Sequence, residues 1–285
     1  MTSYSKMTTK TDTDTEAETE AETDTDTEAD RLRVAIFRPS GRREDESVEL
    51  LEGMGHEVLS DPLLEPRATS ETPFTSAEYT ILTSVTGVDL ALSLSSLDPE
   101  DLESTHVCAI GPKTRDALEE RGVEVSVVPD EYTSTGLVEC LGDEVEEKKV
   151  EVARSDHGSQ KLIDGLNDKG AFVHETVLYE LVRPEGGGDE TVEGVLEGEV
   201  DAVLFTSSLT VEHLLEAADS VGEKEEFIEK LNGNDNDNDN DGVFVGAIGE
   251  PTRETAESVG IDVDYVPEEE TFESLASGLD LTVNN

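Results

Sequence analysis

From residue 31 onward, short apolar runs rich in β-branched residues alternate with amphipathic helical stretches. This alternation is typical of parallel βα units, in which a buried strand is followed by a helix that covers the sheet. The predicted strands are Arg33–Phe37, Glu57–Ser60, Tyr79–Thr83, His106–Ile110, Glu124–Val128, Val150–Arg154, Phe172–Tyr179, Asp201–Thr206, Val243–Ile248 and Asp262–Val266. The predicted helices include Arg42–Met54, Thr114–Arg121, Ser134–Leu141, Ser159–Asp168, Thr210–Ala218, Thr252–Val259 and Phe272–Leu279. The pattern therefore predicts an α/β fold.

The chain also repeats itself. The run ILTSVTGVDLAL, from Ile81, returns as LFTSSLTVEHLL from Leu204. The run CAIGPKTRDALEERGVEVSVVP returns as GAIGEPTRETAESVGIDVDYVP, and VAIFRPSG from Val34 matches VEVARSDHG from Val150. Three such matches indicate two copies of one set of βα units, and so two similar parallel-sheet lobes that arose by internal duplication.

The two copies are not placed end to end. Leu63–Pro66 and Leu178–Pro184 have the pattern of extended crossings between lobes. We therefore expect residues 31–62 and 184–285 to form one discontinuous lobe and residues 67–180 to form the other. The crossings would make a two-stranded hinge, with a ligand cleft between the lobes.

Acidic residues dominate the composition, with 70 Asp and Glu against 20 Lys and Arg and a net charge of −50. Residues 1–30 are a Thr-rich acidic tail without apolar periodicity, which predicts disorder. The Asn/Asp repeat at 232–242 is predicted to be a solvated loop insertion. Molar salt reduces the Debye length to about 3 Å and screens self-repulsion, so the composition favours the cytoplasm of a halophile. An acidic protein that binds a basic partner is the less favoured alternative, because the acidity is spread along the chain.

Several classes of function are disfavoured. No basic stripe is present to bind nucleic acid. No run of about 18 apolar residues and no signal peptide pattern occurs, so we expect a cytoplasmic protein without a membrane partner. Five scattered histidines predict no metal site, and Cys108 and Cys140 are expected to be reduced core thiols. Motifs of hydrolytic nucleophiles are also lacking.

Hydroxyl and glycine residues follow the predicted strands in both copies. In open α/β sheets, ligands bind beyond the carboxyl ends of the strands, where helix N-terminal amides can hold anions. Ordinary helix capping is the alternative explanation for each Ser or Thr. The glycine turns lack the spacing of a phosphate-binding loop. The candidate ligand-binding residues are Arg38, Ser40, Thr83, Ser84, Gly111, Lys113, Thr114, Arg154, Thr206, Ser207, Ser208, Gly249 and Thr252.

The few cations near predicted strand ends could offset the charge of an anionic ligand. They are Arg38, Arg42, Lys113, Arg154 and Lys161. Surface ion pairs with the abundant carboxylates explain each of them equally well. Tyr179 lies in VLYEL at the second crossing, where its ring could pack in the core and its hydroxyl could reach the cleft.

From residue 31 to residue 281 these motifs, taken in order, resemble the uroporphyrinogen-III synthase family of tetrapyrrole (heme, siroheme, cobalamin) biosynthesis. The resemblance rests on VAIFRPSG, the PLLEP crossing, the two TS runs, the two IG runs and VLYELV. It implies a hinge-linked, two-lobed fold. It also implies a cyclising hydro-lyase, without a cofactor, that closes hydroxymethylbilane with inversion of its last ring and loss of water.

The resemblance assigns roles by position. Tyr179 corresponds to a tyrosine that could donate to the departing hydroxyl, and the strand-end hydroxyls and glycine turns correspond to substrate contacts. Glu250 and Val85 depart from the family pattern, which leaves the turn contacts open. A monomer whose small-molecule substrate is hydroxymethylbilane is expected. A non-catalytic tetrapyrrole or anion sensor of the same fold is the alternative, and a sugar-binding receptor is disfavoured because no export signal is present.

Overall fold

The computed structural model describes residues 31–39, 41–93, 97–233 and 242–283, so the predicted tail at 1–30, Ser40 and most of the 232–242 insertion lie outside the described residues. The strands are β1 (Arg33–Ile36), β2 (Glu57–Ser60), β3 (Glu65–Ala68), β4 (Tyr79–Leu82), β5 (His106–Ala109), β6 (Lys149–Ser155), β7 (Phe172–Val182), β8 (Ala202–Phe205) and β9 (Phe244–Ala247). The α-helices are α1 (Arg42–Gly53), α2 (Val85–Ser93), α3 (Pro112–Glu119), α4 (Ser134–Leu141), α5 (Gln160–Asp168), α6 (Asp189–Glu197), α7 (Ser208–Val221), α8 (Lys224–Asn232), α9 (Glu250–Ser258), α10 (Phe272–Ala276) and α11 (Asp280–Val283). Short 3₁₀ turns are η2 (Pro99–Leu102), η3 (Gly142–Val145) and η4 (Ser277–Leu279). The predicted α/β fold is confirmed.

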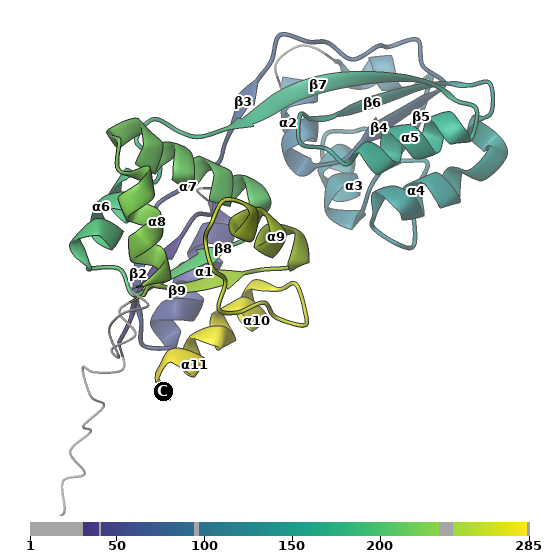
Figure 1. The fold of residues 1–285 in the computed structure, drawn as a ribbon. Coiled ribbons are helices and arrows are strands. Elements are labelled where there is room, and N and C mark those ends of the chain that lie inside the picture. The colour runs from purple at the N-terminus through teal and green to yellow at the C-terminus, as the bar shows by residue number, and fades with distance from the viewer. Residues whose placement is uncertain (1–30, 40, 94–96, 234–241, 284–285) are drawn as a thin grey trace, which may run out of the picture. The chain divides into compact units, whose positions relative to one another are not determined.

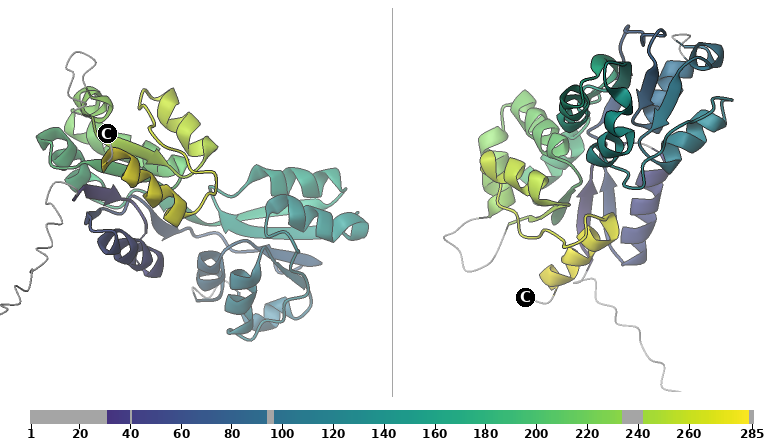
Figure 2. Two further views of the ribbon diagram at one scale, coloured as in Figure 1. Left: turned by 90° about the horizontal axis from the view of Figure 1, so that it is seen from below. Right: turned by 90° about the vertical axis from the view of Figure 1, so that its right-hand side faces the viewer.

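One sheet has four parallel strands in the order β2-β1-β8-β9. Its strands carry buried side chains on both faces, as expected where helices cover both sides of a parallel sheet. On one face, side chains from α6, α7, α8 and α9 join a core around Phe37 and Phe205, whose rings stack with centroids 5.3 Å apart. On the other face lie α1, in purple, and α10, in yellow, from opposite ends of the described chain (Figure 2).

The other sheet has five strands in the order β3-β7-β6-β4-β5 (Figure 1). All neighbours are parallel except β3, which pairs antiparallel with β7. Leucines of α4 and α5 pack on one face against Ile81 and Val152. The other face packs against α2 and α3, with Leu82, Ala153 and Leu178 in its core.

The sequence repeat maps onto strand order. The matched runs pair β1 with β6, β8 with β4, and β9 with β5. Read along the sheets, β2-β1-β8-β9 therefore corresponds to β7-β6-β4-β5. Because β1 precedes its partners in one sheet while β6 follows them in the other, the copies share one strand order in space but differ in chain order. This difference explains why the repeats are not placed end to end in the sequence.

Two predicted strands, Glu124–Val128 and Asp262–Val266, are wrong. Each forms only an isolated parallel bridge, Cys108 with Val127 and Gly246 with Tyr265. The prolines that follow at 129 and 267 have no N–H for a ladder hydrogen bond, so neither segment extends as a strand.

The two predicted crossings pair with each other. Glu65 lies opposite Val182 and Ala68 opposite Tyr179 in the β3–β7 ladder. Buried Asp61, just before the first crossing, accepts hydrogen bonds from the N–H groups of Gly188 and Thr191 at 2.7 and 2.9 Å. Its charge is thereby placed at the N-terminus of α6, where the helix dipole favours an anion. A hinge between lobes stays a prediction.

Candidate functional site

The clearest site geometry lies at the carboxyl edge of the five-stranded sheet. Ser84 follows β4, and Tyr179 lies on β7 opposite Ser155, the last residue of β6. The Ser84 and Tyr179 hydroxyl oxygens are 3.0 Å apart, a hydrogen-bond distance. Tyr179 is buried, with 6% of its surface exposed, so packing fixes the position of the phenol. The structure thus brings together a predicted catalytic residue and a predicted binding residue that are 95 positions apart.

Ser84 also caps a helix. Its Oγ accepts the N–H of Gly87 at 2.9 Å, so its own O–H is available to donate to the phenol oxygen of Tyr179. The matching residue of the other copy, Ser207, accepts the N–H of Thr210 in the same way, at 3.3 Å. Capping and ligand binding were alternatives in the sequence, and the structure shows the capping in both copies.

The two glycine turns have the same design. Gly111 and Gly249 cap α3 and α9 in extended conformations, with φ of −169° and −167°. A Cβ on Gly111 would lie 3.3 Å from Cβ of Tyr132, and one on Gly249 would lie 2.6 Å from Oε1 of Glu270. A side chain at Gly111 would therefore displace Tyr132 by a few tenths of an ångström, whereas one at Gly249 would displace only the flexible end of Glu270; the extended backbone angles suit any residue.

The predicted threonines of these turns are buried. Thr114 and Thr252 are each only 4% exposed, so their hydroxyls face the protein interior. Of the strand-end hydroxyls, Ser208 donates to the carbonyl of Pro251 at 3.0 Å and ties α7 to α9. Thr83 and Thr206 are partly exposed at the ends of β4 and β8.

The two predicted arginines already contact other groups of the protein. Arg154 is 3% exposed; its Nε donates to Glu175 and its Nη1 donates to the carbonyl of Ser159, both at 2.6 Å. The guanidinium of Arg38 lies over the ring of Phe272, 4.5 Å from the ring centre. Lys113 differs from both, because its side chain is exposed in the first turn of α3. Ser40, the remaining predicted residue, lies outside the described residues.

Sequence reasoning missed Tyr132. Its side chain lies against Gly111, and the residue is 60% exposed. The available signal was its position in the repeat: Tyr132 of one copy stands where the other copy has Glu270. An exposed aromatic ring beside a strand-end turn is suited to contact a flat ligand.

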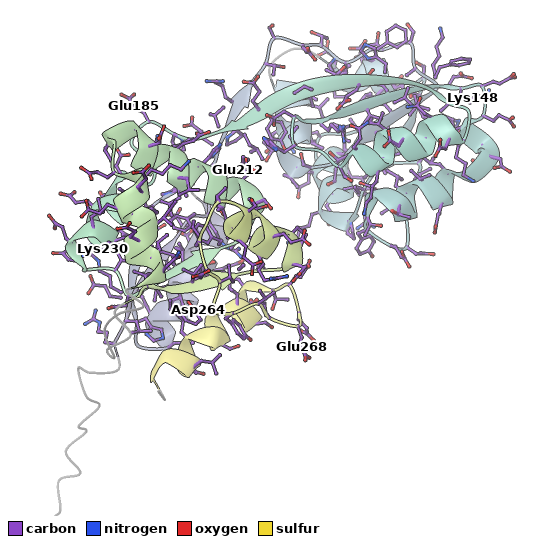
Figure 3. The ribbon with its side chains drawn as sticks, viewed as in Figure 1. Lys148, Glu185, Glu212, Lys230, Asp264 and Glu268 are labelled. Carbon is purple, nitrogen blue, oxygen red and sulfur yellow. The ribbon has the colours of Figure 1, made fainter. Side chains whose placement is uncertain are left out.

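One cavity, of about 540 Å³, lies beside the crossings at the ends of β1 and β2. Its lining includes Glu65, Glu185 and Glu190, so its charge is unfavourable for an anion; Glu185 lies in the loop before α6 (Figure 3). No group of three or more His, Cys, Asp or Glu residues that could hold a metal ion occurs among the described residues. In the same part of the chain, no helix is both long and apolar enough to span a bilayer.

Comparison with known proteins gives one consistent result. The sequence model of the family "Uroporphyrinogen-III synthase HemD" matches residues 45–277. A relative from Methanothermobacter thermautotrophicus that carries the uroporphyrinogen-III synthase name is 33% identical over 257 residues, 86% of this chain and 96% of the relative.

Solved structures show the same fold. A uroporphyrinogen III synthase from Thermus thermophilus superposes with a TM-score of 0.55 at 22% identity, over 89% of this chain and 99% of that chain. The Helicobacter pylori uroporphyrinogen-III synthetase gives 0.56 at 17% identity, with the same coverage of both chains. Together with the sequence matches, this shows that the chain belongs to the uroporphyrinogen-III synthase family.

Proposed function

We propose that this chain is a uroporphyrinogen-III synthase, a cyclising lyase of tetrapyrrole biosynthesis. Its substrate is hydroxymethylbilane. The hydroxyl of the terminal hydroxymethyl group leaves as water, the last pyrrole ring is inverted through a spiro intermediate, and the macrocycle closes. The net reaction converts one bilane into one uroporphyrinogen III and one water.

The observation that carries the proposal, beside family membership, is the Ser84–Tyr179 pair. Ser84 Oγ accepts the Gly87 N–H, so its proton can go to the phenol oxygen of Tyr179. That arrangement leaves the Tyr179 O–H free to donate to a ligand and makes the phenol a better donor. Tyr179 would then protonate the departing hydroxyl, which the substrate loses as water.

Most of the catalysis would come from orientation. The bilane is a flexible octa-anion that closes without help to the symmetric type I ring, so the protein must hold the terminal ring for attack at its substituted carbon. Amides at the helix starts that follow β4 and β5 could hold carboxylates in place. No cofactor enters this reaction. The proposal also includes a cytoplasmic, monomeric protein adapted to high salt.

The isomer ratio of the product tests the proposal. Purified protein in molar KCl, given fresh hydroxymethylbilane with neither metal nor nucleotide, should yield predominantly uroporphyrinogen III, measured by chromatography after oxidation to porphyrin. Dialysis against EDTA should make no difference, and reactions without protein should give type I. Type I alone, at the spontaneous rate, would overturn the proposal. Retained bilane binding in that case would indicate a non-catalytic sensor.

A further inference from the structure

The side chains of strand β7 change face near Tyr179. Val173, close to the start of the strand, packs against the core formed with α4 and α5. Side chains alternate along a regular strand, so every second residue after Val173, up to Leu181, would keep to that face. Tyr179 and Leu181 instead join the opposite core, together with Leu178. Two successive side chains therefore share one face of the sheet, which a regular strand does not allow.

The irregularity is a β-bulge opposite the end of β6. Arg154 lies opposite Val177 and Ser155 lies opposite Tyr179, so the residue between them on β7 has no partner on β6. A shift of one residue turns every later side chain to the other face of the sheet. Here it turns the phenol of Tyr179 into the core beside α2, where its hydroxyl oxygen lies 3.0 Å from Ser84 Oγ. The bulge is thus what brings the candidate proton donor to its partner.

Asp156 holds β7 immediately after the bulge. Strand β6 ends at Ser155, where the chain turns and the N–H of Gly158 donates to the Ser155 carbonyl at 3.1 Å. The N–H of Asp156 donates to the carbonyl of Tyr179, and the N–H of Leu181 donates to Asp156 Oδ1, both at 3.1 Å. In a parallel ladder the second of these bonds would go to a backbone carbonyl of the neighbouring strand. The carboxylate takes the place of that carbonyl and carries the ladder past the end of β6.

The backbone of Tyr179 is held from both sides. Asp156 Oδ1 also accepts the N–H of His157 at 3.0 Å, which fixes the carboxylate relative to its own loop. On the other edge, β7 pairs with β3, where Ala68 lies opposite Tyr179. A buried phenol on a backbone fixed at both edges has little freedom to leave Ser84.

We infer that Asp156 is a positioning residue for Tyr179: its carboxylate closes the bulge and thereby holds the phenol against Ser84. The inference rests on the proposed function, because it concerns the group that donates to the departing hydroxyl. Asp156 does not touch the substrate in this scheme, and no proton passes through it. Its two accepted N–H bonds need an oxygen at the right place but no charge. Asparagine should therefore replace it, whereas alanine and glutamate should not.

The test compares three variants of Asp156 with a matched control, Asp264→Ala. Asp264, labelled in Figure 3, makes the same kind of contact beside the four-stranded sheet: its Oδ2 accepts the N–H of Val245 at 2.8 Å, and its own N–H donates to the Val245 carbonyl at 2.9 Å. Both aspartates are exposed, so Asp156→Ala and Asp264→Ala should fold and should lower the unfolding temperature by similar amounts. The control shows what the loss of one such contact does to kcat away from the candidate site.

The variants should differ in kcat for formation of the type III product. Asp156→Ala should lower kcat about 3- to 10-fold with little change in KM, because the phenol is displaced by a fraction of an ångström while substrate binding is kept. Asp156→Asn should retain the wild-type kcat, since its side-chain oxygen can accept the same N–H groups. Asp156→Glu keeps the charge but moves the acceptor by one methylene group, so its kcat should fall with that of Asp156→Ala. Asp264→Ala should retain the wild-type kcat.

Coupling to the Tyr179 hydroxyl distinguishes positioning from a general loss of stability. In Tyr179→Phe no hydroxyl remains to be positioned, so adding Asp156→Ala should lower kcat no further. Unfolding temperatures of the same variants give a readout that needs no activity. Asp156→Ala weakens the hydrogen bond that Tyr179→Phe removes, so the two losses in unfolding temperature should be less than additive. The losses from Asp264→Ala and Tyr179→Phe should add.

The outcomes separate the inference from the proposed function. An active wild type in which Asp156→Ala matches Asp264→Ala in kcat would refute the inference and leave the proposed function intact. The same holds if Asp156→Ala lowers kcat equally with and without the Tyr179 hydroxyl, or if Asp156→Glu retains kcat and Asp156→Asn does not, because charge rather than geometry would then matter. A wild type that gives only the type I ring would refute the proposed function, and the inference with it.

Discussion

Replacing Tyr179 with phenylalanine removes one oxygen from the candidate site and keeps the buried ring. The ring is 6% exposed and packs in the core with Leu178 and Ala153, so the fold should survive the change. Only the 3.0 Å hydrogen bond to Ser84 is lost within the protein. The variant therefore separates a chemical role of the hydroxyl from a packing role of the ring.

The two roles predict different magnitudes. A hydrogen bond between neutral hydroxyls contributes about 1 kcal/mol to stability, and Ser84 Oγ keeps the Gly87 N–H as a partner, so the unfolding free energy should fall by about that amount. Lost proton donation should lower kcat by about 10- to 100-fold, which corresponds to about 1.4–2.7 kcal/mol in the barrier. Stability loss of this size cannot produce the kinetic effect when the protein remains folded.

The assay measures single-turnover formation of type III product beside thermal unfolding of the same preparation. Ser84→Ala should lower kcat less, since the phenol stays, while it also loses a helix cap worth about 1 kcal/mol. Ser207→Ala removes the equivalent cap of the other copy and should be less destabilising than Ser84→Ala, which also loses the hydrogen bond to Tyr179, and it should lower kcat less. In a double-mutant cycle, Tyr179 and Ser84 should be non-additive in kcat. An unchanged kcat in Tyr179→Phe would assign Tyr179 to packing alone.

Three further outcomes are expected. The unfolding temperature should rise markedly between 0.1 and 2 M KCl, because a chain with net charge −50 repels itself in dilute buffer, and a flat response would contradict adaptation to salt. Burial raises the pKa of the Cys108 thiol from 9.0 to about 12, so the folded state keeps a proton that the unfolded state loses. The unfolding free energy should therefore fall by up to about 1.4 kcal/mol per pH unit from about pH 9 toward 12, and Cys108→Ala should flatten that slope. Gly158→Ala should destabilise the protein by about 1–3 kcal/mol, because its Cβ would lie 2.5 Å from Cδ of buried Arg154, whereas Gly53→Ala meets nothing within 4 Å and should not.

Much of the fold could be predicted because parallel strands are short apolar runs with clear helical partners. The strand Glu57–Ser60 and the helix Ser134–Leu141 agree with their predicted bounds. Helices α6 and α8 are not among the predicted helices, because neither follows a predicted strand directly: α6 comes after a glycine-rich turn and α8 comes straight after α7. The paired crossings were found from composition, but their antiparallel register depends on contacts between residues more than a hundred positions apart.

The site was less predictable, because its side chains form hydrogen bonds with residues far away in the sequence, and no local sequence pattern identifies those partners. Repetition found Ser84 and Ser207 together, yet only the structure shows that one of them meets a tyrosine. Arg154 was a candidate ligand group by its place at a strand end, but Glu175 and Ser159 occupy it. Cys140 was predicted to be a core thiol and is exposed, since it lies on the outer side of α4, whereas Cys108 is buried as predicted.

The duplication also explains why, among the described residues, Ser84 has a tyrosine partner and Ser207 does not. In register, Ile36 pairs with Ser60 and Val152 with Glu175, and the sequence match superposes Ile36 on Val152. Ser60 therefore corresponds to Glu175, and Tyr179 lies four residues after Glu175. The corresponding position in the first crossing is Leu64, or Leu63 when the register shift in the β6–β7 ladder is taken into account, and neither leucine has a hydroxyl. Ser207 therefore caps its helix by accepting the N–H of Thr210, but no tyrosine stands at the matching position for it to contact. The set of strands and helices was duplicated, and the proposed proton donor belongs to the copy with the long strand β7, of 11 residues, where the other copy has the four-residue strand β2.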